Sequence, residues 1–526
     1  MRFTVCSHRF VPSGSCAVRG LSTANERYVA TVESVGDVLQ GFVGGTMRSG
    51  DVSNTFDIED PARGIVFAKA VEASEQDVED AVRCAKEGQL EWASWSTAGR
   101  ARVLQRAATI LKDNADHFAR LETLDTARPY TETLFGDIPS ATDCIEFMGG
   151  LAVNALNGSQ VPLGSGSWGY TVRSPLGVCA GIGAWNYPLQ SAVWKSAPAL
   201  AAGNSIIFKP APQTPLTALE LGRVYDEAGV PKGCYNVLLG KETVGKMLST
   251  HDDIAKVSFT GSVNTGKRVY ADAAQSLKRV TMELGGKSPL IIFGDANLDD
   301  AVSAAMMANW YSNGEVCSNG TRVYVEETLK EKFMALLLKR TQRLVIGDPM
   351  DTGTEIGAMI SRQHMETVRG YVETGIAEGA QIVNPGGGEF VRPENEEFRN
   401  GYYMTPAIFD DCKDDMTIVR EEIFGMVMCV LTFSDEDDVV HRANDSEYGL
   451  SAGLFTNDLT RAHRVANSLE AGTMWVNNYN LAPIELPWAG HKSSGLGQEN
   501  GSACLAQWTK EKSIYMEMGK IDCSYE

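Results

Sequence analysis

A loop cysteine and a strand-end glutamate are the residues best suited by type and setting to covalent chemistry. Cys317 lies in a polar loop flanked by Gly314 and Gly320, directly after a helical pattern. A thiol beside flexible residues is a candidate nucleophile, although a single cysteine is more commonly a small buried apolar residue. Glu283 follows the β-like run 280–282, where a carboxylate among apolar residues is costly unless it is paired or used. The two segments therefore predict a catalytic thiol and a catalytic carboxylate, with a salt-bridged glutamate as the alternative.

A glycine turn between a strand and a helix offers a candidate anion site. The segment Phe259–Gly266 leaves an apolar run, turns at Gly261 and enters an amphipathic helix. The free N–H groups and the dipole of a helix N-terminus approached in this way attract phosphate oxygens. The spacing is G-x-x-x-x-G, however, rather than the G-x-G-x-x-G of the usual dinucleotide fingerprint. From this segment alone, phosphate binding and an ordinary strand-to-helix turn both stay open.

The elements that must position these segments alternate between strand and helix. Short apolar runs between residues 177 and 284 are separated by stretches whose apolar residues recur at three and four. This alternation predicts a parallel, doubly wound sheet, and a second alternation over 289–325 predicts a second α/β domain. The predicted strands are 178–184, 205–208, 235–239, 256–259, 289–293 and 321–325, and the predicted helices are 75–94, 100–120, 216–228, 265–274 and 298–311.

Length, charge and cysteine usage narrow the class of protein. With 526 residues the chain exceeds what one hydrophobic core usually organises, so two large domains are expected. The net charge of −20 disfavours a nucleic-acid partner but is compatible with a cationic small substrate. No apolar run reaches the roughly 20 residues of a membrane-spanning helix. The 11 cysteines form no C-x-x-C pair and the 7 histidines no closely spaced pair, so neither a disulfide framework nor a metal site is predicted.

The first 25 residues differ in composition from the rest of the chain. They carry Arg2, Arg9 and Arg19 among several Ser and Thr residues, and no acidic residue precedes Glu26. This composition is typical of a mitochondrial transit peptide, and a disordered N-terminus is the alternative. We therefore expect a mitochondrial or a cytoplasmic enzyme, with the mitochondrial matrix favoured.

Together these segments resemble the aldehyde dehydrogenase superfamily. Met282–Pro289 is similar to the glutamate signature of that family, and Gly314–Gly320 to its cysteine signature. The match runs in the family's order from about Asn54 to the C-terminus. Further similar blocks are Phe259–Ser262, Glu421–Gly425, Ala184–Pro188 and Lys209–Ala211.

The resemblance implies an activity and a set of site residues. Cys317 would attack an aldehyde carbon, Asn186 would donate its amide to the resulting oxyanion, and Glu283 would activate the water that hydrolyses the thioester. NAD would accept the hydride, with NADP possible, and Glu499 corresponds to a second carboxylate near the site in many relatives. The resemblance assigns Trp185, Lys209, Gly261, Ser262, Glu422 and Phe424 to cofactor binding, and Tyr187, Trp194, Tyr311 and Trp488 to substrate binding.

Three positions depart from the family pattern. Pro212 stands where many NAD-preferring relatives place a glutamate that binds the adenosine ribose, so the preference for NAD over NADP is moderate. Glu315 replaces the usual glutamine, and its charge would raise the pKa of Cys317 or attract a cationic substrate. Met426 replaces a proline and puts the rigidity of that loop in doubt. None of these changes removes a catalytic group.

Within the family, the segment Tyr187–Leu200 looks most like dehydrogenases of 4-trimethylaminobutyraldehyde and betaine aldehyde. A trimethylammonium group cannot donate a hydrogen bond, so aromatic faces hold it best, and Trp194, Tyr311 and Trp488 would form such a cage. The favoured reaction is oxidation of 4-trimethylaminobutyraldehyde to γ-butyrobetaine, a carnitine precursor. The alternatives are betaine aldehyde, 4-aminobutyraldehyde or a broad range of aldehydes. From other classes, a CoA-acylating enzyme and a catalytically retired structural or binding protein are disfavoured by the presence of the expected catalytic residues.

The resemblance also implies a domain plan. We expect a Rossmann-like cofactor domain over 45–150 and 174–284, and a catalytic α/β domain over 285–485. A small β oligomerisation arm is expected over 151–173 and 502–521, and it would join subunits into a homotetramer or homodimer.

Overall fold

The computed structural model describes residues 23–48, 51–164, 166–521 and 523–525. Most of the predicted targeting segment, residues 1–22, lies outside these ranges. Thr23 caps the first helix, α1 (Ala24–Val35), and exchanges hydrogen bonds with Glu26 in a capping box. A helix is therefore present before residue 45, where the predicted cofactor domain starts. Three short strands follow: β1 (Val38–Leu39), β2 (Phe42–Val43) and β3 (Thr46–Met47).

An eight-stranded sheet in the order β22-β12-β11-β8-β9-β10-β2-β3 forms the larger half of the molecule. Its five central strands are parallel, and their order along the chain reverses between β8 and β11. A doubly wound sheet of this kind binds its ligand beyond the carboxyl ends of the strands at the point of reversal. The strands are β8 (Val178–Ile182), β9 (Ser205–Lys209), β10 (Tyr235–Val237), β11 (Ile254–Thr260), β12 (Arg279–Glu283) and β22 (Gly495–Leu496).

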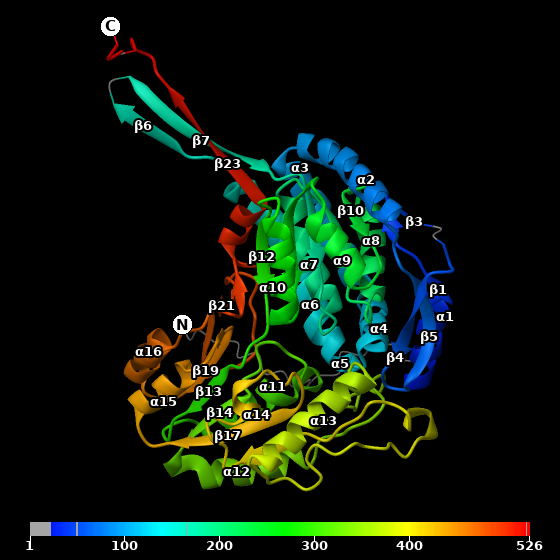
Figure 1. Cartoon of the computed structure of the whole chain (residues 1–526), viewed down its shortest axis with the longest axis vertical. Helices are drawn as coiled ribbons and strands as arrows, with labels where there is room; N and C mark the ends of the chain where they lie inside the picture. The colour runs from blue at the N-terminus through cyan, green and yellow to red at the C-terminus, as the bar shows by residue number, and fades with distance from the viewer. Residues whose placement is uncertain (1–22, 49–50, 165, 522, 526) are drawn as a thin grey trace, which may run out of the picture.

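Helices cover both faces of this sheet (Figure 1). α7 and α8 pack on one face, with α6 behind α7, while α2, α9 and α10 pack on the other. The predicted helix 100–120 is divided at Asn114, whose side-chain amide donates to the carbonyl of Ile110 and so ends α3. The helices are α2 (Glu75–Ser94), α3 (Thr97–Asp113), α4 (Ala115–Thr126), α5 (Tyr130–Glu132), α6 (Ile138–Ala155), α7 (Pro188–Ala201), α8 (Leu216–Ala228), α9 (Glu242–Thr250) and α10 (Val263–Ala274), and a π-helical turn, η1 (Thr133–Asp137), joins α5 to α6.

A seven-stranded sheet in the order β15-β16-β17-β14-β13-β19-β20 forms the second half. All its neighbouring strands are parallel except the edge pair β15 and β16. The strands are β13 (Pro289–Ile292), β14 (Arg322–Glu326), β15 (Gln381–Ile382), β16 (Ala407–Asp410), β17 (Val427–Phe433), β19 (Ser451–Phe455) and β20 (Thr473–Val476). The helices are α11 (Leu298–Trp310), α12 (Glu327–Thr341), α13 (Arg362–Ala377), α14 (Thr417–Arg420), α15 (Glu436–Asn444) and α16 (Leu459–Ser468).

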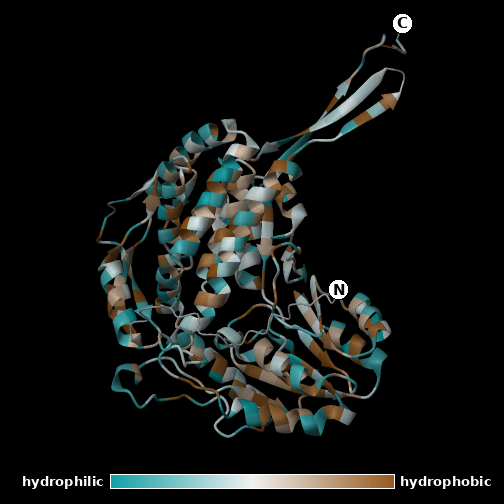
Figure 2. Ribbon diagram, turned by 180° about the vertical axis from the view of Figure 1, so that it is seen from behind, coloured by the Kyte–Doolittle hydropathy of each residue, from teal (hydrophilic) through white to brown (hydrophobic). Residues whose placement is uncertain are grey.

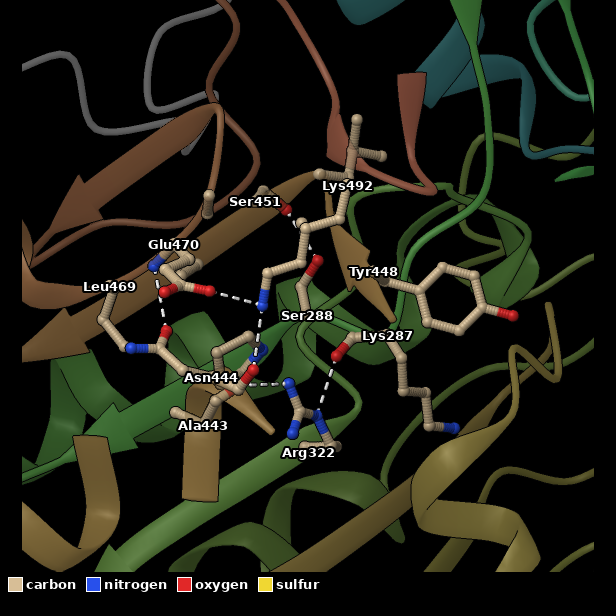
Figure 3. A pocket seen from close by; sticks show the side chains of 15 residues that line it. Lys287, Ser288, Arg322, Ala443, Asn444, Tyr448, Ser451, Leu469, Glu470 and Lys492 are labelled. Carbon is tan, nitrogen blue, oxygen red and sulfur yellow. Dashed lines mark hydrogen bonds and ion pairs between the residues drawn. The ribbon is translucent and has the colours of Figure 1, made fainter. Parts of the chain in front are cut away.

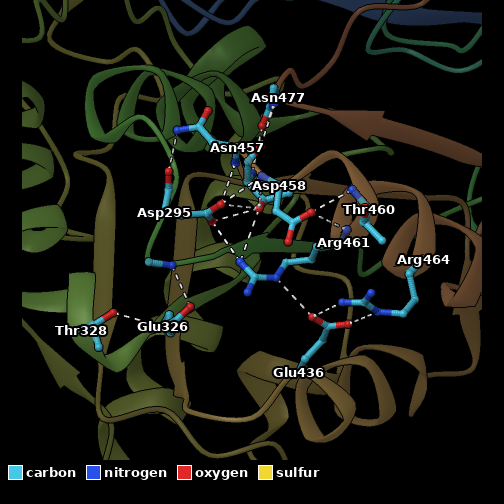
Figure 4. A network of polar contacts seen from close by, with 12 residues as sticks. Asp295, Glu326, Thr328, Glu436, Asn457, Asp458, Thr460, Arg461, Arg464 and Asn477 are labelled. Carbon is cyan, nitrogen blue, oxygen red and sulfur yellow. Dashed lines mark hydrogen bonds and ion pairs between the residues drawn. The ribbon is translucent and has the colours of Figure 1, made fainter.

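Polar contacts at the surface fix the loops of this second half. The Asp295 carboxylate accepts hydrogen bonds from the Thr456 hydroxyl at 2.9 Å and from the Asn457 and Asp458 N–H groups at 3.0 Å (Figure 4). Arg461 pairs with the same carboxylate at 3.1 Å. These contacts anchor the turn between β19 and α16 to the end of β13.

Hydrophobic residues line the strands, and the outer surfaces of the helices are more hydrophilic (Figure 2).

A three-stranded antiparallel sheet in the order β23-β7-β6 extends away from both halves (Figure 1). Its strands are β6 (Gln160–Gly164), β7 (Ser167–Pro175) and β23 (Thr509–Met516). The predicted boundary at residue 150 falls inside α6, and residues 502–508 form a 3-10 helix with buried side chains rather than arm. The division into domains itself stays a prediction.

Two small sheets are also present. β4 (Thr55–Asp60) and β5 (Ile65–Val71) pair antiparallel, with β1 added alongside β5. β18 (Tyr448–Gly449) pairs with β21 (His491–Lys492). Among the described residues, no helix is both long and apolar enough to cross a bilayer, and no cluster of three metal-ligating side chains is present.

Candidate active site

One cavity of about 1530 Å³ gathers every residue that the sequence predicts for the site. It opens where β8, β9, β11 and β12 end, which is the point at which the strand order reverses. Cys317 reaches it from the loop between α11 and β14, and Phe424 from the loop between α14 and β17. Trp488 reaches it from the C-terminal segment. The lining includes Cys317, Glu283, Asn186, Trp185, Lys209, Gly261, Ser262, Glu422, Phe424, Tyr187, Trp194, Tyr311 and Trp488, together with Glu499.

The loop that carries Cys317 leaves α11 through a strained turn. Ser312, Asn313 and Gly314 adopt positive φ angles of 55°, 54° and 75°. Such angles cost a non-glycine residue about 1 kcal/mol or more and persist only where the surroundings hold them. Here the Asn313 side chain accepts from the Gly357 N–H and donates to the Ala358 carbonyl, each at 2.8 Å. The turn therefore presents Cys317 from a rigid base.

Burial and nearby charge oppose ionisation of this thiol. Burial raises the pKa of Cys317 to about 12, and the Glu422 and Glu283 carboxylates add to the effect. The thiol is therefore protonated at neutral pH in the absence of ligands. Any nucleophilic role requires a base or a cation to favour the thiolate.

Asn186 lies against the cysteine loop. Its side-chain Nδ2 donates to the Glu315 carbonyl at 2.9 Å. A primary amide carries two N–H donors, so one remains for a ligand. The arrangement allows this amide to donate to an oxygen held near Cys317.

Glu283 ends β12 with both carboxylate oxygens buried and without a hydrogen-bond partner among the described residues. Burial raises the pKa of Glu283 well above its ordinary value, and the facing carboxylate of Glu499 raises it further. Glu499 itself accepts from Lys195 Nζ at 2.7 Å and from the Ser258 hydroxyl at 3.0 Å. Lys195 also donates to the Thr260 hydroxyl at 2.7 Å. An unpartnered buried carboxylate beside this network is suited to exchanging a proton with water.

Three aromatic side chains and the Glu422 carboxylate form one part of the cavity lining. The ring of Trp185 contacts the rings of Phe424 and His364 edge to face, with centroids 5.2 and 5.4 Å apart. Phe424 has φ 60°, and its carbonyl lies 2.8 Å from His364 Nε2. Glu422 Oε1 accepts from the Gly286 N–H at 2.9 Å, and burial raises its pKa to about 7.

Ser262 and Lys209 border the same part of the lining. Ser262 caps α10, its hydroxyl accepting from the Thr265 N–H, which confirms a helix start at the predicted glycine turn. Burial lowers the pKa of Lys209 to about 8, and its ammonium donates to the Pro210 carbonyl at 3.0 Å. Pro212 also lines the cavity and offers no carboxylate there.

Tryptophan and tyrosine side chains form another part of the cavity lining. The rings of Trp194 and Trp488 meet edge to face with centroids 5.9 Å apart. The Arg128 guanidinium lies over the Tyr187 ring at 4.1 Å and near the Tyr311 ring at 5.9 Å. One face of Tyr187 is thus already in contact with a cation of the protein.

Sequence reasoning missed several carboxylates of this cavity. Glu132, Asp137, Asp143 and Glu485 all line it. Burial raises the pKa of Asp143, and the charges of Glu146 and Glu485 add to that effect. The recurrence of acidic residues along 132–143 could have suggested an acidic helical wall, but their direction depends on how η1 and α6 pack.

The expected role of Glu315 is not supported by its position. Its carboxylate is absent from the cavity lining and accepts from the Ile360 N–H at 3.0 Å. The carboxylates that raise the pKa of Cys317 are instead Glu422 and Glu283. Met426 is buried among core residues, so packing substitutes for the missing proline.

A second, much smaller pocket lies behind this site, around Lys287, Arg322 and Lys492 (Figure 3). Its volume of about 10 Å³ suits a single water molecule rather than a substrate. Lys492 pairs there with Glu470 at 2.6 Å, and Arg322 donates to the Lys287 carbonyl at 2.7 Å. These contacts are structural.

Known proteins resemble the chain closely in sequence. A family model described as the aldehyde dehydrogenase family matches residues 48–514. A betaine aldehyde dehydrogenase of Sinorhizobium fredii is 54% identical over 465 residues, which is 88% of this chain and 94% of that protein. One of Agrobacterium fabrum is 50% identical over 484 residues, covering 92% and 97%.

Solved structures resemble the fold as well. An NAD⁺ complex of an aldehyde dehydrogenase from Bacillus cereus has a TM-score of 0.89 at 37% identity, covering 95% of this chain and 99% of that one. A betaine aldehyde dehydrogenase from Staphylococcus aureus in complex with NAD⁺ has a TM-score of 0.90 at 33% identity, with the same coverage.

Proposed function

The chain belongs to the aldehyde dehydrogenase family, and from that premise we propose that it oxidises betaine aldehyde to glycine betaine with NAD. The observation that carries the proposal is the identity of 50–54% with betaine aldehyde dehydrogenases over about nine-tenths of the chain. The predicted fold class is confirmed, and the protein is an aldehyde-oxidising oxidoreductase. The favoured sequence prediction, 4-trimethylaminobutyraldehyde and carnitine synthesis, finds no support in these comparisons, whereas the betaine-aldehyde alternative does.

The lining of the cavity supports a small cationic substrate. The Trp194 and Trp488 rings offer aromatic surface for a quaternary ammonium group, which attracts such a cation by roughly 0.5–2 kcal/mol. The carboxyl groups of Asp143 and Glu485 in the same cavity would attract a cation when ionised. A neutral aldehyde gains nothing from either feature beyond apolar contact.

The residues on the Trp185 side fit NAD. The N–H groups at the N-terminus of α10, beside Ser262, suit phosphate oxygens. A side chain at Gly285 would place its Cβ 2.0 Å from Glu422 Oε2, so only glycine leaves that carboxylate room beside the loop. Glu422 would accept from ribose hydroxyls, and Lys209 would donate near the adenosine end. NAD, when bound, supplies the acceptor for the aldehyde's hydride.

The chain's own groups would carry the covalent steps. The Cys317 thiol would first lose its proton to water in the cavity, and the sulfur would then form a bond to the aldehyde carbon. The carbonyl oxygen, now negative, would accept from Asn186 Nδ2 and from the Cys317 N–H. After hydride loss the carbon is a thioester. The ionised form of Glu283 would take a proton from a water that attacks the thioester carbon, and the C–S bond would break to give the acid and the Cys317 thiolate. The thiolate would then take up the proton held by Glu283, which restores the thiol and the carboxylate.

We further propose that the β6, β7 and β23 arm joins subunits. The exposed apolar side chains of Val161, Leu163 and Tyr515 on this narrow sheet support an assembly role. The number of subunits stays a prediction.

Substrate choice is tested by following NADH production with betaine aldehyde, 4-trimethylaminobutyraldehyde, 4-aminobutyraldehyde, hexanal and 3,3-dimethylbutanal. The last is the neutral carbon isostere of betaine aldehyde, so it separates charge from shape. We expect kcat/KM to be highest for betaine aldehyde, and W488A to lower its advantage over the isostere by roughly 2- to 30-fold. Equal kcat/KM values for betaine aldehyde and its isostere would contradict the proposed substrate, and an equal loss on both in W488A would make Trp488 ordinary packing.

Cofactor affinity should depend on pH through Glu422. Burial raises the pKa of this carboxyl to about 7, so it loses its proton between about pH 6 and pH 8. The ionised form is the better acceptor for ribose hydroxyls, so NAD should bind more tightly at the higher pH, by up to about tenfold for one linked proton. Titration calorimetry at several pH values measures this directly. The E422Q variant should bind NAD more weakly, and its affinity should not depend on pH. A Kd that does not change with pH in the unmodified protein would contradict the role of Glu422 in NAD binding.

A further inference from the structure

A buried arginine contacts residues that line the cavity without lining it itself. Arg128 follows α4 and is fully buried, with 0% of its surface exposed. Its two terminal nitrogens donate to the two carboxylate oxygens of Asp137, one of them at 3.1 Å. Asp137 ends the η1 turn and lines the cavity. The guanidinium is therefore neutralised in place, as a buried cation must be.

The remaining contacts of Arg128 go to residues of the site. Its Nη1 also donates to the Asn186 carbonyl at 3.3 Å, and its plane lies 4.1 Å from the Tyr187 ring centroid. The Tyr311 ring is 5.9 Å away. All three residues line the cavity, whereas Arg128 does not. It holds them from behind without meeting the substrate.

Asn186 and Tyr187 are consecutive in the chain, and under the proposed function they would contact different ends of the substrate. Fixing the Asn186 carbonyl fixes the peptide from which its amide side chain reaches the cysteine loop. Holding the Tyr187 ring in place would keep an aromatic part of the lining close to the cationic end of the substrate. A planar guanidinium can hold a carboxylate in two places and stack on a ring at once, whereas a lysine ammonium cannot.

We propose that Arg128 is a positioning residue for the reaction: it holds Asn186 and the Tyr187 and Tyr311 rings in register, and so couples oxyanion stabilisation to recognition of the substrate's cationic end. The role in recognising the cationic end of the substrate rests on the proposed function. The role in positioning Asn186 applies to any aldehyde that the enzyme turns over. A displacement of about 1 Å at a reacting centre costs on the order of 100-fold in rate, so a positioning residue can have a large effect without contacting substrate.

The test compares R128K with two further variants. R128K keeps the charge but loses the planar fork. R128M/D137N removes both charges together, so that no unpaired Asp137 is left buried to unfold the protein. R63K is the matched control, because Arg63 is also buried, pairs with Asp60 at 3.1 Å and stacks on the Tyr28 ring at 3.4 Å, yet lies outside the cavity.

Three quantities are measured for each variant: the melting temperature, kcat per titrated active site with betaine aldehyde and hexanal, and the ratio of kcat/KM for betaine aldehyde to that for 3,3-dimethylbutanal. For R128K and R128M/D137N we expect kcat to fall roughly 10- to 100-fold with both aldehydes. The ratio should fall by roughly 3- to 10-fold, because the aromatic wall loosens. R63K should lower the melting temperature but leave kcat and the kcat/KM ratio unchanged.

A purely structural role predicts a different pattern. If R128K and R128M/D137N keep kcat per active site and the isostere ratio near the unmodified values, as R63K does, the proposal is wrong. A wild-type enzyme without preference for betaine aldehyde would overturn the proposed substrate and the recognition half of this proposal. Loss of kcat on hexanal in that case would still support the hold on Asn186, so the two failures are distinguishable.

Discussion

Replacing Cys317 by alanine should reduce kcat by roughly 10⁴- to 10⁶-fold, because Cys317 is the one cysteine among the described residues that line the cavity, and a thioester requires a thiol. The residual rate would reflect only bound reactants held together in the site. NAD should bind as before, since Trp185, Glu422 and Ser262, which would hold the cofactor, are unchanged in this variant. Steady-state NADH production and calorimetric NAD titration measure the two effects separately.

Cys84 provides the control for this experiment. It is partly buried in α2 and absent from the cavity, so C84A changes one thiol to a methyl group away from the site. C84A should keep kcat within about twofold. Substantial turnover by C317A, with stoichiometric acyl-enzyme still detected by mass spectrometry, would assign the nucleophile to another residue.

Replacing Glu283 by glutamine should slow thioester hydrolysis by roughly 10²- to 10⁴-fold, the usual contribution of a general base. Hydride transfer does not require this base, so a rapid burst of NADH should be followed by a slow steady state. The burst amplitude should approach one NADH per active site. Stopped-flow absorbance gives both phases, and quenching during the slow phase should trap an acyl group on Cys317.

Glu315 is the matched control for Glu283. Both are buried glutamates with raised pKa values, but the Glu315 carboxylate accepts from the Ile360 N–H and does not line the cavity. E315Q can keep that acceptor through its amide oxygen, so hydrolysis should stay within a few-fold of the unmodified rate. A normal steady-state rate in E283Q without accumulated acyl-enzyme would remove Glu283 from the mechanism.

The segment from Arg128 to Glu132, before η1, shows where sequence reasoning stopped. Glu132 accepts from the Ser312 N–H at 3.0 Å, and Arg128 holds Asn186, but neither residue belongs to a recognised motif. Their roles come from contacts between residues that are 180 and 58 positions apart in the chain. No local pattern reports such a meeting.

Glu315 illustrates the opposite case, in which local reasoning led to an expectation that the position of the side chain does not support. Its position two residues before Cys317 suggested an effect on the thiol or on the substrate. Three consecutive positive φ angles just before it turn its side chain toward Ile360 instead. The direction of a side chain after a strained turn depends on what holds that turn, here the contacts of Asn313 with Gly357 and Ala358.

The sequence by itself determined the chemistry-bearing groups and the elements beneath them. Cys317, Glu283, the turn at Gly261 and the alternation of strand and helix are readable because each depends on neighbours a few residues away. Only the tertiary structure decided that these groups share one cavity, that both oxygens of Glu283 lack partners among the described residues, and that Arg128 lies behind Asn186. The physical reason is that burial, pKa and side-chain direction are set by atoms brought together across two sheets, and folding rather than spacing places them there.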